Sequence, residues 1–234
     1  MVSQKGGTGK STLAIGLAIA AMQDGHKVCL LEADPQGTVS NWRRRRTQSE
    51  PTVEIVTGHG DLAHRLPFLE RCGVTLTIID TAGGHSATTV AAIEAADLCL
   101  IPARPSPADI EASAPTLATI RASDKPFAFV LNQTPVRSFR LTNAAASLSD
   151  TATALNASGV LALPYIVLRN DQQDALGAGL AVTEYALCGK SADEISGLWQ
   201  WVWGRLTVAD ADTPADMYGV AAPANAQAAL SAAS

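Results

Sequence analysis

Nine consecutive residues near the start of the chain, 4–12, have the composition and spacing needed to hold a nucleoside triphosphate. Their glycines turn backbone N–H groups inward, and the start of a following helix adds further donors for phosphate oxygens. In such a loop Lys10 reaches the β and γ oxygens, while the hydroxyl of Ser11 is a ligand for Mg²⁺. This stretch, the phosphate loop, predicts a site for a nucleoside triphosphate and Mg²⁺ whose binding residues are Gly6, Gly7, Thr8, Gly9, Lys10, Ser11 and Thr12.

Two aspartates each follow an apolar run that has the character of a buried strand. Asp34 comes after residues 28–33, and Asp80 comes after residues 75–79 and is followed closely by two glycines. Ligands of open α/β sheets bind at the carboxyl ends of the strands, so both carboxylates should face the phosphates. Asp80 is predicted to hold Mg²⁺ through water. For Asp34 the alternative is a strand-end aspartate that caps the next helix.

The elements that must position these residues follow from the alternation of apolar runs with longer segments of helical period. This alternation predicts an α/β fold with a mostly parallel sheet and helices on both faces. The expected strands are 27–33, 53–57, 75–80, 98–102, 126–132 and 160–163. The expected helices are 10–24, 61–71, 87–95, 107–121, 142–156 and 192–206.

The start of the chain is unusual for a phosphate loop. Such loops normally follow a buried central strand of about five residues, yet only Met1, Val2 and Ser3 precede Gln4. Either the first strand is very short or the true start lies upstream.

Composition restricts the class of protein. With 234 residues, 47% of them hydrophobic, and a net charge of −5, the chain is neither disordered nor fibrous. The charge argues against constitutive binding of a polyanion but allows a local basic face. Four cysteines without a CxxC pair and the lack of a signal segment predict a reduced, cytoplasmic protein. One domain is expected over residues 1–206, followed by a mostly disordered acidic tail over 207–234.

A second lysine, Lys5, distinguishes this phosphate loop, because the ordinary GxxxxGK[ST] pattern does not require it. The sequence KGGTGKS over residues 5–11 is a deviant Walker A motif, and the N-terminal segment that contains it resembles the ParA/MinD family of ATPases. The resemblance extends over residues 2–206, through LPYIVLR at 163–169 and GLAVTEY at 179–185. It implies a P-loop NTPase fold of the small plasmid or orphan type, without an N-terminal helix-turn-helix domain.

The resemblance also implies roles for individual residues. In this family the lysine matched by Lys5 reaches across a nucleotide-sandwiched dimer to the partner's phosphates. Asp34 matches the acid that positions the attacking water, whereas Glu32 replaces an aspartate and is given no catalytic role. Asn132 matches an asparagine that reads the adenine edge, with a turn-forming asparagine as the alternative.

Basic residues are the candidates for DNA contact. The one basic run, Arg43, Arg44, Arg45 and Arg46, would spread around a helix at about 100° per residue and cannot line one stripe. A solvated face is therefore the favoured interpretation, and a nucleotide-sensitive patch for DNA phosphates or an acidic partner is the alternative. Further candidates are Arg137, Arg140, Arg169, Lys190 and Arg205.

A tryptophan-rich helix, expected over residues 192–206, raises the question of a membrane-surface anchor. It has little positive charge and precedes an acidic segment, so packing against the sheet is the favoured interpretation and no membrane partner is expected.

The resemblance implies a slow, Mg²⁺-dependent ATP hydrolase that forms a homodimer when ATP is bound. The dimer would bind DNA non-specifically in the nucleoid, and a ParB-like or other cargo-bound protein would stimulate hydrolysis, as in plasmid partition and DNA segregation. Three alternatives stay open. One is a conjugation accessory that resembles VirC-type relatives and binds a transfer origin. The others are a metabolic enzyme, such as an amide ligase or dethiobiotin synthetase relative, and an iron–sulfur carrier, whose ligand motifs the cysteines do not match.

Overall fold

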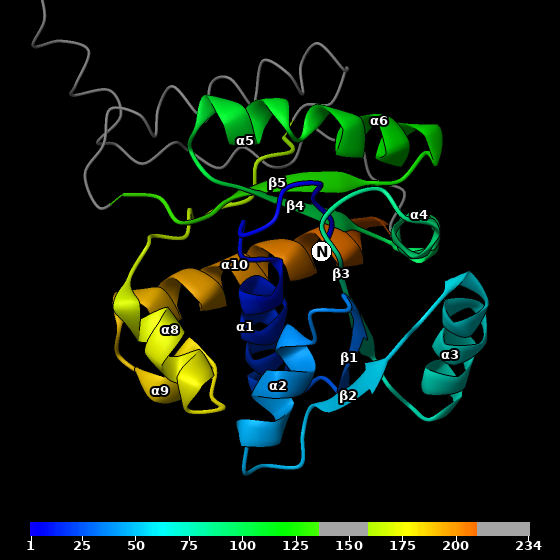
Figure 1. Ribbon diagram of the computed structural model, residues 1–234. Coiled ribbons are helices and arrows are strands. Elements are labelled where there is room, and N and C mark those ends of the chain that lie inside the picture. The colour runs from blue at the N-terminus through cyan, green and yellow to red at the C-terminus, as the bar shows by residue number, and fades with distance from the viewer. Residues whose placement is uncertain (136–158, 210–234) are drawn as a thin grey trace, which may run out of the picture.

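Parallel strands form the framework of the molecule, which is a computed structural model in which residues 1–135 and 159–209 are described (Figure 1). The strands are β1 (Val28–Ala33), β2 (Thr52–Ile55), β3 (Leu76–Thr81), β4 (Cys99–Ala103) and β5 (Phe127–Leu131). Two groups of parallel strands have the orders β2-β1-β3 and β4-β5. The predicted α/β class with a parallel sheet is confirmed.

Met1 and Val2 lie between these two groups and connect them. The Met1 nitrogen donates to the Ile79 oxygen at 2.7 Å, and the Thr81 nitrogen donates to the Met1 oxygen at 3.3 Å. On the other side, the Val2 nitrogen donates to the Leu100 oxygen at 3.0 Å. Residues 1 and 2 therefore occupy the place of a central strand between β3 and β4, but only at its carboxyl end.

Helices cover both faces of the strands. They are α1 (Lys10–Gln23), α2 (Thr38–Arg45), α3 (His59–Arg71), α4 (Ala87–Ala95), α5 (Pro107–Glu111), α6 (Ala114–Ala122), α8 (Asn170–Gly177), α9 (Val182–Tyr185) and α10 (Lys190–Ala209). Helices α1, α2 and α10 share one apolar core with β1, β4 and β5, while α3, α4 and α6 pack on the opposite face (Figure 1).

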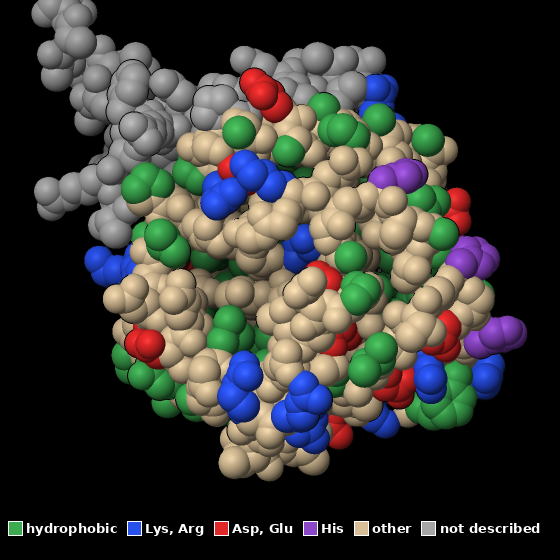
Figure 2. All heavy atoms as spheres, in the orientation of Figure 1, with side chains coloured by type: hydrophobic (Ala, Val, Ile, Leu, Met, Phe, Trp, Pro, Cys, Tyr) green, Lys and Arg blue, Asp and Glu red, His purple; other side chains and the backbone are tan. Residues whose placement is uncertain are grey.

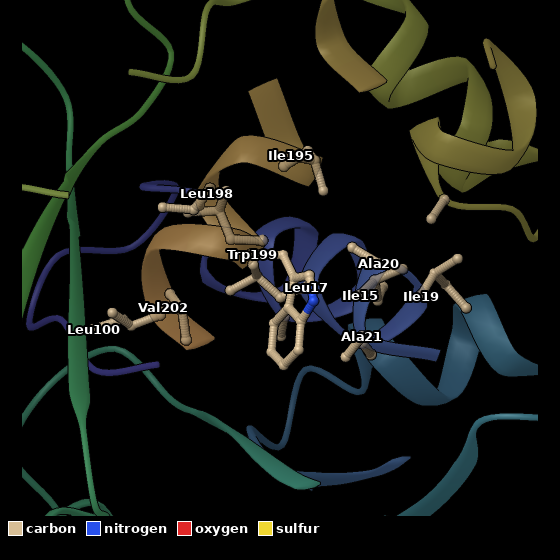
Figure 3. Packing of buried hydrophobic residues seen from close by; sticks show 14 of the residues in the cluster. Ile15, Leu17, Ile19, Ala20, Ala21, Leu100, Ile195, Leu198, Trp199 and Val202 are labelled. Atoms are coloured by element: carbon tan, nitrogen blue, oxygen red, sulfur yellow. The ribbon is translucent and has the colours of Figure 1, made fainter. Parts of the chain in front are cut away.

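The pair α1 and α10 forms the centre of the larger core. Leu17 of α1 faces Trp199 and Leu198 of α10, and Leu100 of β4 lies beside Val202 (Figure 3). Trp199 is buried, so this part of the tryptophan-rich helix packs inside the molecule, as predicted. Within the described ranges, no helix combines the length and apolar character needed to cross a bilayer.

Several predicted boundaries were wrong. The helix expected over 107–121 is divided into α5 and α6, because Pro115 lacks the N–H needed to continue a helix and instead lies in the first turn of α6. Helix α10 spans Lys190–Ala209 and is therefore longer at both ends than the helix expected over 192–206. In place of a strand over 160–163, the structure has a single bridge at Leu161. The helix expected over 142–156 and the tail beyond residue 209 lie outside the described residues.

Candidate nucleotide site

The phosphate loop opens helix α1. Gly9, its N-terminal cap, has φ of 87° in the left-handed region, and Gly7 has φ of 75°. A Cβ atom at Gly9 would collide with the side-chain amide of Asn132, so this position accepts glycine alone. Lys10 and Ser11 are the first residues of α1, where helix N–H groups are free to bind an anion.

Two side-chain amides that follow β5 hydrogen-bond to the backbone of the phosphate loop. The Asn132 amide nitrogen donates to the Thr8 oxygen at 2.8 Å, and the Gln133 amide nitrogen donates to the Gly7 oxygen at 3.0 Å. Asn132 is 5% exposed and its own backbone nitrogen is bonded to Ala103. Sequence reasoning gave no role to Gln133, although its position next to Asn132 was the available signal.

A small cavity of about 60 Å³ lies beside these two amides. Gly9 and Thr12 of the loop line one side, and Asn132, Leu168 and Gln172 line others. The adenine-reading role predicted for Asn132 stays a prediction.

Three carboxylates meet at the carboxyl ends of β1 and β3. The register pairs Glu32 with Asp80, so Asp34 follows β1 on the same edge as Asp80. Asp34 and Asp80 both act electrostatically on Lys10. The structure therefore brings together Lys10, Ser11, Asp34 and Asp80, four residues that are separated in the sequence by up to 70 positions.

Asp80 is fully buried, and neither of its carboxylate oxygens has a hydrogen-bond partner among the described residues. Burial raises its pKa to about 6, against the opposing influence of the Met1 ammonium and Lys10. The Ser11 hydroxyl is close enough to oppose this shift as well, but its geometry falls short of a hydrogen bond. A buried carboxylate without a partner, next to a hydroxyl, fits the oxygen ligands that Mg²⁺ prefers.

Lys10 is the cationic part of the same group. It is 6% exposed, and burial lowers the pKa of its ammonium, while Asp80 and Asp34 oppose that shift. Burial takes the Lys10 ammonium out of water and disfavours its charged form. A bound phosphate would supply a countercharge at this place and stabilise that form.

Glu32 has a structural contact. Its carboxylate accepts from the backbone nitrogens of Val39 at 2.7 Å and Ser40 at 3.0 Å, and from the Ser40 hydroxyl. These are donors in the first turn of α2, so Glu32 caps that helix. Asp34 lies in the segment between Glu32 and α2, so the contact of Glu32 with α2 holds both ends of that segment.

Lys5 points to a carboxylate of its own chain. Its ammonium lies 3.0 Å from Asp109 in α5, whose other oxygen accepts from Arg104 at 3.1 Å. Burial raises the pKa of Asp109, but hydrogen bonds from Ser106, Lys5 and Arg104 outweigh this and lower it overall. Asp109 was missed by sequence reasoning, because nothing near Lys5 in the sequence indicates a partner 104 residues away.

The four arginines of the basic run have different environments. Arg46 is buried and makes two bonds of 2.7 Å to Glu184 of α9. Arg44 and Arg45 are exposed and Arg43 is half-buried, and none of these three has an ion-pair partner among the described residues. Figure 2 shows basic side chains over the end of α2.

The other DNA candidates also divide. Arg169 is bonded to both oxygens of Glu194 of α10, and Arg205 lies over the ring of Trp201. Lys190 is exposed at the start of α10. Arg137 and Arg140 lie outside the described residues.

A glycine-rich loop at a helix N-terminus, a lysine within it and a buried carboxylate beside it define a P-loop nucleotide-binding domain. The chain belongs to the CobQ/CobB/MinD/ParA nucleotide-binding domain family, whose model matches residues 1–198.

Relatives support the same membership. The chain is 34% identical over 119 residues to VirC1 of Rhizobium radiobacter, which covers 47% of this chain and 49% of that protein. It is 30% identical over 202 residues to the maintenance of carboxysome distribution protein A (McdA) of Halothiobacillus neapolitanus, 82% of this chain and 89% of that protein. The chain spans about half the length of the first relatives that it matches.

Solved structures show the fold. An ATP complex of a McdA variant from Cyanothece covers 88% of this chain and 94% of its own, with a TM-score of 0.71 and 18% identity. MinD in a complex with MinC from Aquifex aeolicus covers 87% and 94%, with a TM-score of 0.70 and 17% identity. The predicted P-loop fold with a parallel sheet and helices is therefore confirmed.

Proposed function

We propose that this protein is an Mg²⁺-dependent ATPase that dimerises on ATP and positions a DNA or protein cargo by nucleotide-controlled, non-specific binding to DNA. The observation that carries the proposal is Asp80, a buried carboxylate with two unpartnered oxygens next to Lys10 at the phosphate loop. Burial disfavours the charged form of Asp80 in the free protein, and Mg²⁺ would stabilise that form while Lys10 binds a phosphate.

The residues have separate tasks in this proposal. Lys10 and the N–H groups of the loop bind and orient the phosphates, while Ser11 and Asp80 would hold Mg²⁺, which supplies charge neutralisation on the phosphoryl oxygens. Asp34 orients the attacking water. Because these groups mostly position and neutralise, hydrolysis in the isolated subunit is slow, and a partner protein accelerates it.

Lys5 makes the site a shared one. In the free subunit it is paired with Asp109, 3.0 Å away, and not with the loop of its own chain. We propose that it exchanges this carboxylate for the phosphates of a second subunit when the ATP-bound dimer forms. The exposed Arg44 and Arg45 at the end of α2 are the proposed DNA contacts, because they carry charge that no carboxylate among the described residues neutralises.

Likeness to VirC1 favours a second candidate, an accessory ATPase that binds a transfer origin. It shares the nucleotide chemistry and differs in DNA specificity. In both cases we propose a protein of the cytoplasm that associates with DNA.

The test uses Asp34→Ala, which should bind ATP, dimerise and fail to turn over. Light scattering would give its mass, and a fluorescent duplex of arbitrary sequence would report DNA binding, with and without Mg·ATP. A dimer that binds the duplex in a salt-sensitive way supports the proposal.

Lys10→Ala is the matched control, since it should lose ATP binding and remain monomeric. A dimer that ignores arbitrary duplexes but binds a transfer-origin duplex favours the second candidate. Wild-type stimulated ATPase in Asp34→Ala would refute the assignment of that aspartate, and a monomer in Mg·ATP would refute the dimer.

A further inference from the structure

Two cations share the single carboxylate of Asp109. Lys5 lies 3.0 Å from one carboxylate oxygen, and the Nε of Arg104 lies 3.1 Å from the other. Asp109 itself is 4% exposed, whereas the side chains of Lys5 and Arg104 are 32% and 36% exposed. Figure 2 shows basic and acidic atoms together next to α5. One positive charge is therefore in excess in this group of three, at the edge of the phosphate loop.

Arg104 and Asp109 are held together by a local turn between β4 and α5. The Ser106 nitrogen donates to the Arg104 oxygen at 2.7 Å, and the Asp109 nitrogen donates to the Ser106 oxygen at 3.0 Å and to its hydroxyl oxygen at 3.3 Å. The Ser106 hydroxyl donates in turn to the Asp109 carboxylate. These bonds all lie within six consecutive residues, so the turn places the guanidinium beside the carboxylate without any contribution from Lys5.

Lys5 is the member of the group that can leave. It comes from the other end of the sequence, 104 positions before Asp109. In the part of the chain that the structure describes, Asp109 is the only carboxylate that pairs with it. Breaking that one contact frees the ammonium, and Asp109 keeps its contacts with Arg104 and the Ser106 hydroxyl. The local turn is therefore complete with or without Lys5.

Arg104 determines how costly the departure of Lys5 is. A carboxylate as buried as that of Asp109 is destabilising when it has no countercharge. With Arg104 present, the loss of Lys5 leaves a balanced pair. With a neutral residue at position 104, the same step would leave a buried negative charge alone, so Asp109 would hold the ammonium more strongly.

The titration of Asp109 supports this description. Burial raises the pKa of its carboxyl, but hydrogen bonds from Ser106, Lys5 and Arg104 and the charge of Arg104 outweigh burial and lower the pKa overall. The carboxyl is thus ionised at neutral pH, and two cations compete for a full negative charge.

We propose that Arg104 is a positioning residue that controls the release of Lys5, because it competes for Asp109 and supplies the countercharge when Lys5 leaves. The inference rests on the proposed function, in which Lys5 exchanges Asp109 for the phosphates of a second subunit. Arg104 acts through Asp109 and does not itself contact the nucleotide. It sets the fraction of subunits in which the Lys5 ammonium is free, and with it the strength of the ATP-bound dimer.

The first measurement uses the full chain without nucleotide. Acetic anhydride labels free lysine amines, and mass spectrometry of the peptides gives the labelling rate of Lys5. Arg104→Gln should slow that rate about threefold, because Lys5 is then the only cation on Asp109. Arg104→Lys keeps the charge and should restore a rate close to that of the wild type. Lys190, exposed at the start of α10, is the internal reference and should label equally in all three proteins.

The second measurement is sedimentation in Mg·ATP on the Asp34→Ala background. Arg104→Gln should weaken the dimer about tenfold. Adding Asp109→Asn should remove this loss, because no charged carboxylate then remains to hold Lys5. If Arg104 only stabilised α5, Asp109→Asn would not rescue it.

The outcomes separate this proposal from the proposed function. Unchanged labelling of Lys5 in Arg104→Gln would overturn the role of Arg104, and so would a weakened dimer that Asp109→Asn does not restore. A parent Asp34→Ala protein that stays monomeric in Mg·ATP would refute the dimer instead. The labelling rates in the free subunit would still decide whether Arg104 competes with Lys5 for Asp109.

Discussion

Two ionisable side chains are almost completely buried in different regions, Asp80 at the end of β3 and Arg46 after α2. Arg46 donates to both oxygens of Glu184, to the Glu50 oxygen at 2.6 Å and to the Gly179 oxygen at 3.3 Å. Asp80 has no hydrogen-bond partner among the described residues for either oxygen. One charge is satisfied within the chain, and the other is left to be satisfied by something that binds.

This difference separates a structural charge from a functional one. Arg46 connects α2 to α9 and lies over the ring of Trp42 at 5.1 Å, so it belongs to the packing of that side of the molecule. Asp80 reduces the stability of the free protein at neutral pH, because burial of its carboxyl outweighs the attraction of the Met1 ammonium and Lys10 and raises its pKa to about 6. The two residues should therefore respond to neutral substitution with opposite signs.

The largest effect is expected for Arg46→Ala. Breaking its pair leaves the mostly buried Glu184 without its countercharge and with the Ala181 nitrogen as its remaining donor among the described residues, which should cost about 3 kcal/mol. The free energy of unfolding, measured in urea at pH 7, would report this loss. Arg44→Ala, at an exposed position of the same run, is the control and should change stability by less than about 0.5 kcal/mol. Equal losses in the two variants would remove the distinction.

Asp80→Asn should stabilise the protein without Mg²⁺ at pH 7, by about 2 kcal/mol. The pKa of Asp80 is raised to about 6, so the penalty for its charge is fully present above that pH. It disappears as the pH falls from 6 toward 4, because the folded protein takes up a proton before the unfolded chain does.

Thermal unfolding of both proteins across this pH range checks the prediction. The gap in Tm should be largest at pH 7 and close by pH 4, and Mg·ATP should stabilise the wild type more than the variant. A gap that does not depend on pH would mean that packing, and not the carboxylate charge, separates the two proteins.

The role of a charged residue was predictable from the sequence only where the residues next to it in the chain form a recognisable motif. The phosphate loop, Asp34 and Asp80 follow from local patterns, since strand ends in a parallel sheet meet at one edge. The roles of Arg46, Asp109 and Gln133 depend on partners between 104 and 138 residues away. No local pattern carries that information, and the four arginines look equivalent in the sequence.

The fold was predictable to a similar extent and for the same reason. Apolar runs predict both ends of each strand from β1 to β5 to within two residues. Helix α2 was not predicted as an element, because its first turn is stabilised by Glu32, a cap seven residues before Val39. The division between α5 and α6 depends on Pro115, whose effect within an otherwise helical pattern was underestimated.

Arg44 and Arg45, the exposed residues of the basic run, should differ from the buried Arg46 in that they affect DNA binding and not stability. Replacing Arg44 and Arg45 with alanine should leave stability unchanged but weaken binding of an arbitrary duplex about tenfold near 0.1 M salt. The slope of log affinity against log salt should fall by roughly two, one for each phosphate contact. Fluorescence anisotropy over a salt series measures both quantities. An unchanged slope would return these arginines to an ordinary solvated face.

The smallest effect is expected for Asp109, because its carboxylate has three hydrogen-bond donors and the loss of its charge leaves some of these contacts in place. Asp109 accepts from Lys5, Arg104 and the Ser106 hydroxyl, so losing one negative charge leaves the α5 region folded but weakens the hold on Lys5. Asp109→Asn should therefore release Lys5 for a second subunit and strengthen ATP-dependent dimerisation about threefold. Sedimentation of the Asp34→Ala background with Mg·ATP, with and without Asp109→Asn, measures the change. Adding Lys5→Ala must abolish the gain, because a gain that persists without that ammonium comes from a source other than the released lysine.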